Sequence, residues 1–187
     1  MEYQRDAERR VRIGVVGVGS HSYRNILSTL TYLPVELVAI ADVDAPTAEK
    51  TARQYAAKAY TSATEMYAAE DLEAVLLCVS PQLHPQLAVE AFEAGLHVWL
   101  EKPVGVLAED VEKMISARGD RIAVVGFKKA FMPATRKAIE LLAEEGSTPL
   151  RTLMGTYPMD VPPNGKDVIA NRETPSFIHA GTACPLR

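Results

Sequence analysis

The feature that most constrains the fold is a glycine-rich turn between an apolar run and a segment of helical period. The run is VRIGVV at Val11–Val16, and the turn that follows reads GVGSHS over residues 17–22. Apolar residues then recur on one helix face over residues 22–33, until Pro34. Because the residue before a proline resists helical geometry, these features predict a strand, a tight turn and a helix over 22–33.

The rest of the chain alternates in the same way. Apolar runs predict strands at 35–41, 59–61, 74–79, 97–100 and 122–125, and helical periods predict helices at 46–56, 63–69, 87–94 and 108–117. This alternation is typical of an α/β fold, a Rossmann doubly wound parallel sheet with helices on both faces. After Gly126 we expect a helix at 134–143 and a strand within 150–157. We therefore predict a Rossmann domain at 1–126 and the incomplete start of a second α/β domain at 127–187.

Composition excludes several classes of function. A formal charge of −4 and the lack of a basic run argue against a nucleic-acid partner. No apolar stretch approaches the ~18 residues of a membrane helix, and the polar first ten residues do not suggest a secretory signal. The two cysteines, Cys78 and Cys184, form no CxxC pair and no disulfide framework. We expect a cytoplasmic protein without a membrane, nucleic-acid or metal partner.

The turn at residues 17–22 has the pattern G-x-G-x-x-S, close to the dinucleotide fingerprint G-x-G-x-x-G/A. Gly17 permits the tight turn, and Gly19 lets a pyrophosphate approach the backbone. Ser22 is small enough for close packing of helix on strand, and it is a good N-cap residue. Because a helix N-terminus offers free N–H groups, we expect Ser20, His21 and Ser22 to border the phosphates.

An acidic residue appears where this type of site requires one. Asp42 ends the strand predicted at 35–41, and its carboxylate can accept hydrogen bonds from the adenosine ribose hydroxyls. The same carboxylate would repel a 2′-phosphate, and no arginine follows it, so the sequence favours NAD as cofactor. Arg24 lies close enough in sequence to leave NADP as the alternative.

Two further groups follow strands at the edge where ligands of open parallel sheets bind. Ser80 and Pro81 are expected to form a loop over the cofactor, and His84 starts a helix, either in the site or as a surface histidine. Cys78 fits a buried core residue better than a nucleophile.

The second group is E-K-P at residues 101–103. There Lys102 can hydrogen-bond a substrate hydroxyl or move its proton, unless it is only an exposed lysine paired with Glu101.

Together these stretches resemble the Gfo/Idh/MocA oxidoreductases. The resemblance rests on IGVVGVGSHSYRN, VAIADVD, DLEAVLLCVSPQLHPQLAVEAFEAGLHVWLEKPVG and VGFKKAF. It implies a second α/β domain with an open antiparallel sheet, and hydride transfer between a nicotinamide cofactor and a sugar or polyol. It also implies that the cofactor is contacted by Gly17, Gly19, Asp42, Ser80, Pro81, His84, Glu101 and Lys102. Lys102 is then the best catalytic candidate.

The chain also departs from that family. Ser22 replaces the third glycine, Asn25 stands where a histidine is common, and the final SFIHAGTACPLR has no histidine before Pro185. Relatives are expected to be longer, so an expression fragment, a frameshift or early-stop product, and a genuine short protein completed by association all remain open. The alternatives to an enzyme are a non-catalytic nucleotide-binding protein, an inactive remnant, or an interaction subunit without cofactor. Uncovered sheet surface predicts a homo-oligomer.

Overall fold

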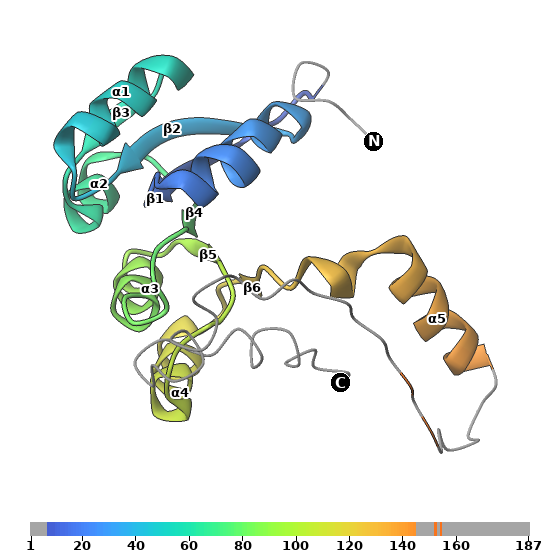
Figure 1. Ribbon diagram of the computed structural model, residues 1–187. Coiled ribbons are helices and arrows are strands. Elements are labelled where there is room, and N and C mark those ends of the chain that lie inside the picture. The colour runs from blue at the N-terminus through green and yellow to red at the C-terminus, as the bar shows by residue number, and fades with distance from the viewer. Residues whose placement is uncertain (1–6, 145–151, 153, 155–187) are drawn as a thin grey trace, which may run out of the picture. The chain divides into compact units, whose positions relative to one another are not determined.

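The computed structural model describes residues 7–144, 152 and 154. Within them lies a parallel sheet of six strands in the order β3-β2-β1-β4-β5-β6 (Figure 1). The strands are β1 Val11–Val16, β2 Val35–Ala41, β3 Lys58–Tyr60, β4 Ala74–Leu77, β5 His97–Leu100 and β6 Ala123–Val125. The predicted fold class is confirmed. The chain divides after Gly126 into two units, and the sheet lies in the first.

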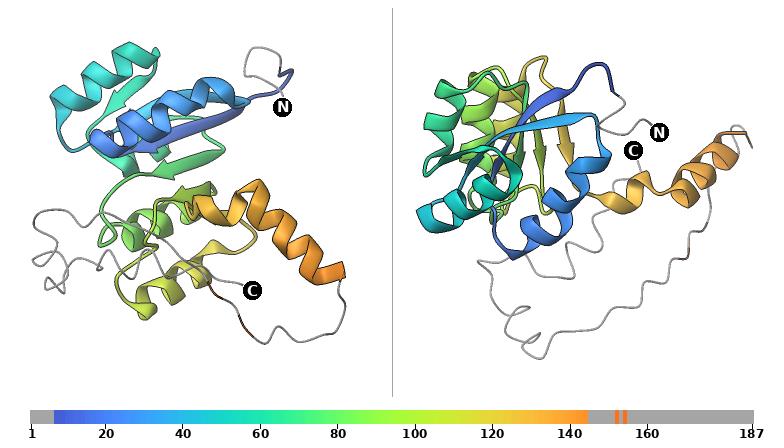
Figure 2. Two further views of the ribbon diagram at one scale, coloured as in Figure 1. Left: turned by 45° about the vertical axis from the view of Figure 1, so that its right-hand side comes forward. Right: turned by 90° about the horizontal axis from the view of Figure 1, so that it is seen from above.

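Helices occupy the segments between the strands (Figure 2). In the first unit they are η2 Ser22–Ile26, η3 Leu27–Tyr32, α1 Ala45–Tyr55, α2 Ala63–Ala69, α3 His84–Glu93 and α4 Ala108–Arg118. The second unit contains η4 Lys128–Phe131 and α5 Pro133–Glu144. No helix in the described part of the chain is both long and apolar enough to span a bilayer.

The sheet is covered on both faces because its strands are apolar on both sides. Ile13 and Val15 of β1 pack with Leu27 and Leu30 of η3 on one face. Val16, one position further along β1, belongs to the cluster of the other face, which includes residues of α2, α3 and α4 such as Met66, Phe92 and Met114. Side chains alternate across a strand, so a continuous apolar run fills two cores at once.

The order of the strands fixes where a ligand can bind. From β1 the chain proceeds to β2 and β3 on one side, then returns to β4, β5 and β6 on the other. The loops after β1 and β4 therefore lead away in opposite directions. A crevice opens between such loops at the carboxyl ends of the strands.

The first helix differs from its prediction. The sequence predicts one helix over 22–33, whereas the structure has a π-helical segment, η2, followed by the 3-10 segment η3. The Ser28 hydroxyl donates to the Arg24 carbonyl at 2.7 Å and the Thr29 hydroxyl to the Ile26 carbonyl at 2.8 Å. Such side-chain bonds compete with the regular ladder and bend helices. The helix still ends before Pro34, where Leu33 is extended.

Most other elements match their predictions within a few residues. Strand β4 ends at Leu77, two residues before the predicted end. Helix α3 starts at His84, as predicted for that residue, and ends at Glu93, one residue before the predicted end. Gly95 has φ +82° just after α3, as a helix stop requires. Of the strand predicted within 150–157, only residues 152 and 154 are described, and neither belongs to a strand. Cys184 and the final segment lie outside the described residues.

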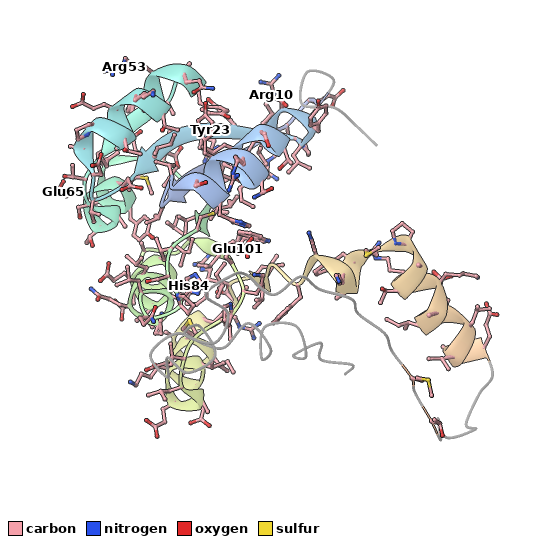
Figure 3. The ribbon with its side chains drawn as sticks, in the orientation of Figure 1. Arg10, Tyr23, Arg53, Glu65, His84 and Glu101 are labelled. Atoms are coloured by element: carbon pink, nitrogen blue, oxygen red, sulfur yellow. The ribbon has the colours of Figure 1, made fainter. Side chains whose placement is uncertain are left out.

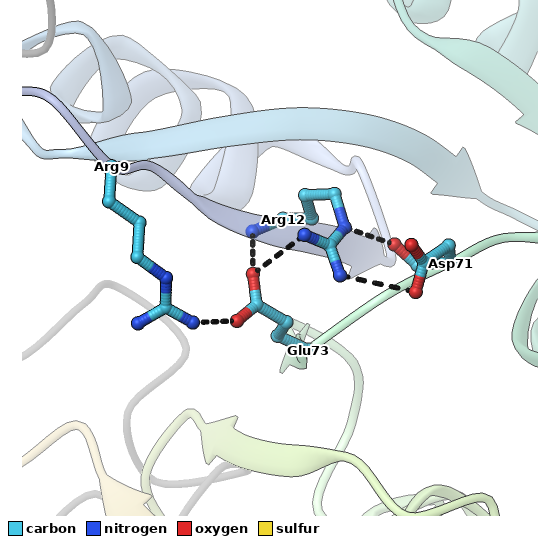
Figure 4. Close-up of polar contacts among 4 residues, drawn as sticks. All are labelled: Arg9, Arg12, Asp71 and Glu73. Atoms are coloured by element: carbon cyan, nitrogen blue, oxygen red, sulfur yellow. Dashed lines mark hydrogen bonds and ion pairs between the residues drawn. The ribbon is translucent and has the colours of Figure 1, made fainter.

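A polar cluster joins the start of β1 to the start of β4 (Figure 4). The Glu73 carboxylate accepts from the Arg12 backbone N–H at 3.0 Å and from the Arg9 guanidinium. The Arg12 side chain in turn donates to the carbonyl and carboxylate of Asp71. These bonds fix the register of two central strands at the edge opposite to the crevice.

Candidate functional site

The turn after β1 is shaped so that only glycine fits at Gly17. Its φ is +85°, and a Cβ built there would lie 2.6 Å from the Cys78 carbonyl oxygen and 2.9 Å from the Val79 side chain. The chain thus passes directly over the end of β4. This close approach explains the first glycine of the pattern, both through its backbone angle and through lack of space.

Gly19 is different, because a Cβ built there would meet no atom within 4 Å. Its backbone therefore faces open space. It borders two cavities, one of about 400 Å³ and one of about 590 Å³. A pyrophosphate can approach the backbone at this position in the way that the fingerprint requires.

The cavity of about 400 Å³ extends over the carboxyl ends of β1, β2 and β4. Its lining includes Gly17, Gly19, Asp42, Thr61, Val79 and Leu83. The crevice expected from the strand order is thus present, with glycine backbone, a carboxylate and apolar side chains around it. This mixture fits the adenosine half of a dinucleotide.

Asp42 is held in place by the turn itself. One carboxylate oxygen accepts from the Val18 backbone N–H at 2.8 Å and the other from the Asp44 backbone N–H at 3.0 Å. These bonds orient the carboxylate at the end of β2, where it borders the cavity. Because each carboxylate oxygen accepts more than one bond, a ribose hydroxyl can still donate to it.

Ser22 is 1% exposed, in agreement with its expected role in close packing. It does not act as the N-cap, since η2 has no side-chain cap. Cys78 is largely covered, and burial raises the pKa of its thiol to about 12. The thiol is therefore protonated near neutral pH, as expected for a core residue and not for a nucleophile.

The E-K-P turn contributes a third, smaller cavity of about 170 Å³, lined by His21, Cys78, Val79, Glu101 and Lys102. The Glu101 carboxylate accepts from the His21 ring at 3.0 Å and from the Lys102 backbone N–H at 3.0 Å. The Lys102 ammonium has no carboxylate within ion-pair distance among the described residues. Lys102 is exposed, as the alternative of a surface lysine expects, but the pairing with Glu101 that this alternative included is absent.

His84 is completely buried at the start of α3, so the alternative of a surface histidine is wrong (Figure 3). Its Nδ1 lies 3.0 Å from the Pro103 carbonyl oxygen. Because a carbonyl only accepts, Nδ1 carries the proton. Burial lowers the pKa of His84. With no exposed ring atom, His84 is suited to hold the E-K-P turn, whose Lys102–Pro103 peptide is cis.

The structure brings most of the predicted site residues to one edge. Gly17, Gly19 and Asp42 border the cavity of about 400 Å³, whereas His21, Glu101 and Lys102 border the cavity of about 170 Å³. Val79 and Cys78 border both cavities and connect them. Ser80 and Pro81 lie in the loop after β4, where the Ser80 carbonyl accepts from the Leu83 N–H at 3.0 Å.

Sequence reasoning missed several residues of this edge. Leu83 and Leu87 line the cavity of about 400 Å³. Their spacing of four residues across the start of α3 could have indicated that they share one face. Thr61 follows β3 and carried no signal of its own. Asn25, noted only as a departure, contacts His21.

A doubly wound sheet, a glycine turn open to solvent and an acid at the tip of β2 define a dinucleotide-binding domain of the Rossmann class. Residues 11–135 match the model of the oxidoreductase family with an NAD-binding Rossmann fold, Gfo/Idh/MocA. The chain belongs to the Gfo/Idh/MocA oxidoreductase family.

Its relatives include named dehydrogenases. Inositol 2-dehydrogenase 3 of Saccharopolyspora erythraea is 33% identical over 147 residues, which are 75% of this chain and 43% of that protein. Inositol 2-dehydrogenase of Salmonella typhimurium is 32% identical over 129 residues, 65% of this chain and 38% of that protein. The chain thus spans less than half the length of these relatives.

Solved structures agree with the fold. The WlbA dehydrogenase from Bordetella pertussis, crystallised with NADH and UDP-GlcNAcA, has a TM-score of 0.65 and 29% identity, covering 71% of this chain and 42% of that one. A probable dehydrogenase from Thermotoga maritima has a TM-score of 0.66 and 29% identity, covering 72% of this chain and 41% of that one.

Proposed function

We propose that the chain binds NAD, with NADP as the second choice, and supports hydride transfer between the nicotinamide and a hydroxyl of a sugar, polyol or related substrate. The observation that carries this proposal is the open backbone at Gly19 beside the oriented carboxylate of Asp42. The inositol dehydrogenases among its relatives support the substrate class.

The residues fit the parts of such a cofactor. The backbone amides around Gly19, Ser20, His21 and Ser22 would hold the pyrophosphate at the start of the helix. Asp42 would accept from the adenosine ribose, and the carboxylate disfavours a 2′-phosphate, which supports NAD over NADP. Val79 and the loop of Ser80 and Pro81 would border the part of the cofactor that extends toward Lys102.

When bound, the nicotinamide supplies the hydride acceptor or donor. The chain's own contribution is placement and proton handling. Lys102, whose ammonium has no carboxylate partner among the described residues, would hydrogen-bond the substrate hydroxyl and assist the loss of its proton. Glu101 and His84 hold the turn from which Lys102 projects.

A second candidate is a non-catalytic nucleotide-binding protein. It is favoured by the sequence of the final segment, which lacks the histidine before Pro185 that the family resemblance implies. The two candidates share the cofactor site and differ in turnover. An interaction subunit without cofactor is the third, and it predicts no affinity for NADH.

The experiment uses the 187-residue chain in two steps. Titration with NADH, followed by cofactor fluorescence, should show saturable binding, and a folded chain without binding would overturn the proposal. A screen of sugars and polyols with NAD then separates the enzyme from the non-catalytic binder. In the active case, Lys102→Ala should lower turnover by roughly 10²–10⁴-fold and leave NADH affinity nearly unchanged. Equal losses in both would contradict the role of Lys102.

We also propose that the chain self-associates and works in the cytoplasm. Several apolar side chains of the second unit are exposed, among them Phe131, Ile139, Leu141 and Leu142. Exposed apolar surface of this kind favours association. The charge and cysteine content support a cytoplasmic setting.

A further inference from the structure

The contact between the two turns of the site involves a histidine whose proton can be placed from the geometry. The Asn25 side-chain nitrogen lies 3.1 Å from the His21 carbonyl oxygen and 3.2 Å from the His21 ring Nδ1. Because the carbonyl only accepts, this Asn25 atom must be the NH₂ group, and its second hydrogen points to Nδ1. Nδ1 is therefore an acceptor without a proton.

The protonation of the other ring nitrogen of His21, Nε2, follows from this assignment. In the neutral imidazole one nitrogen donates when the other accepts, so Nε2 carries the proton. Nε2 lies 3.0 Å from Glu101 Oε1, and a carboxylate only accepts. The three side chains thus form a directed chain of hydrogen bonds, from Asn25 through His21 to Glu101.

Glu101 is the end of this chain and also a neighbour of the candidate catalytic lysine. Its second oxygen accepts from the Lys102 backbone N–H at 3.0 Å, so hydrogen bonds at both oxygens fix the orientation of the carboxylate. The Glu101 side chain is only 14% exposed. Held in this way, it does not pair with the Lys102 ammonium, although the two residues are adjacent in sequence and line one cavity.

We propose that His21 is a positioning residue of the site: it holds the Glu101 carboxylate against the Lys102 backbone and thereby keeps this carboxylate from pairing with the Lys102 ammonium. The inference deepens the proposed function, because a free ammonium is what the substrate hydroxyl requires. It also links the turn that would bind the pyrophosphate to the turn that carries Lys102. Asn25 sets the tautomer that makes the bond to Glu101.

The first test needs no cofactor and starts from the wild-type chain. Nitrogen-15 NMR of the histidine rings in their neutral form should show His21 with a protonated Nε2 and an unprotonated Nδ1. Asn25→Ala should reduce that preference. The Nδ1–H tautomer in the wild-type chain, or a mixture that Asn25→Ala leaves unchanged, would overturn the proposal.

The second test measures the two consequences at Lys102 in the cofactor-free chain. His21→Leu should accelerate hydrogen exchange of the Lys102 backbone amide by roughly tenfold, since Glu101 loses its orienting bond. It should also slow acetylation of the Lys102 amine by roughly threefold, because the released carboxylate can pair with it. His21→Gln, which retains an N–H donor, should restore both values to within about twofold.

Tyr23→Phe is the matched control, because Tyr23 lies on the same helix and donates to Gln54 at 2.8 Å without contact to Glu101. It should leave both Lys102 readouts unchanged. A folded His21→Leu chain with wild-type values at Lys102 would overturn the proposal. If that variant does not fold, the ring NMR of the wild-type chain decides. If NADH fails to bind while these readouts behave as expected, the proposed function fails and the positioning contact stands.

Discussion

Gly17 and Gly19 stand two residues apart in one turn and serve different purposes. Gly17 has a backbone angle that disfavours side chains, and the end of β4 fills the space where a Cβ would lie. Gly19 is surrounded by open space. The first glycine is therefore needed for folding, whereas the second is needed only when a ligand approaches.

This difference gives a prediction for the pair of alanine variants. Gly19→Ala should unfold at nearly the wild-type temperature but bind NADH at least about tenfold more weakly, a loss of ~1.4 kcal/mol. Gly17→Ala should lower the free energy of unfolding by about 2–4 kcal/mol, from strain and overpacking together. Thermal unfolding and NADH titration measure both effects. Gly19→Ala with wild-type affinity would mean that the pyrophosphate does not lie at this turn.

His84 makes stability depend on pH. Burial lowers the pKa of His84 in the folded chain, so in mildly acidic solution the unfolded chain binds more protons. The stability that the neutral ring contributes is complete above the ordinary histidine pKa of about 6.5 and is lost as the pH falls below it. Chemical denaturation between pH 8 and pH 5 should show this decline.

His84→Asn is the informative variant, because an amide N–H can replace the donor to the Pro103 carbonyl without titrating. It should have a flatter stability profile than the wild type over the same pH range. An unchanged slope in this variant would assign the decline to another group.

At the scale of single residues, sequence patterns predicted Gly17, Gly19 and Asp42 at the crevice because each has a backbone or charge requirement that its residue type reveals. They left the state of Lys102 and His84 open. Whether Lys102 pairs with Glu101 depends on His21, which lies 80 positions earlier in the chain. A local sequence pattern cannot reveal a contact between residues that lie so far apart in the chain.

Among the elements, β1 and β4 depend on the polar cluster at their starts. Hydrogen bonding by the Arg12 backbone lowers the pKa of Glu73, with smaller contributions from the Arg9 and Arg12 charges. The folded chain therefore favours the charged form of Glu73. The stability gained from this is complete above the ordinary glutamate pKa and is lost as the pH falls through the lower folded value.

We expect Glu73→Gln to lower the thermal midpoint at neutral pH, with the difference from wild type shrinking below about pH 4. Differential scanning calorimetry at several pH values measures it. Glu49→Gln, which removes an exposed pair with Arg53, is the control and should change little at any pH. A Glu73 effect that persists undiminished at low pH would show that packing, not charge, is responsible.

The first helix shows what patterns of apolar residues miss at this scale. Its apolar spacing correctly predicted which residues face the sheet, since Leu27 and Leu30 are buried. It could not predict the π and 3-10 segments, because these follow from hydroxyl groups of Ser28 and Thr29 that bond to the backbone. The periodicity of apolar residues shows which face of a helix is buried. The pattern of backbone hydrogen bonds also depends on side chains that compete for the backbone carbonyls.

For the whole molecule, the doubly wound class of the sheet could be predicted because continuous apolar runs require cover on both faces. That requirement and the alternation of elements leave few arrangements, and the doubly wound sheet is the one observed. Assembly is a different matter. Assembly depends on exposed surfaces, and the periodicity of the sequence does not reveal which partner an exposed surface binds.

Self-association is nevertheless a definite expectation of the account. Size-exclusion chromatography with light scattering should give a mass at least twice that of the 20.4 kDa chain. The elution should shift toward the monomer on dilution, because the exposed apolar side chains favour contact only at sufficient concentration. A clean monomer at high concentration would contradict the prediction and leave the cofactor site unaffected.

Backbone NMR with NADH can show whether the turn after β1 and the carboxylate after β2 hold a dinucleotide. We expect saturable shifts of the amide signals at residues 17–22 and at Asp42, with smaller ones at residues 79–81 and 101–102. In Gly19→Ala these shifts should need at least about tenfold more NADH to reach the same size. Spectra of the wild-type chain that stay unchanged in excess NADH, or that change only away from these residues, would contradict this expectation.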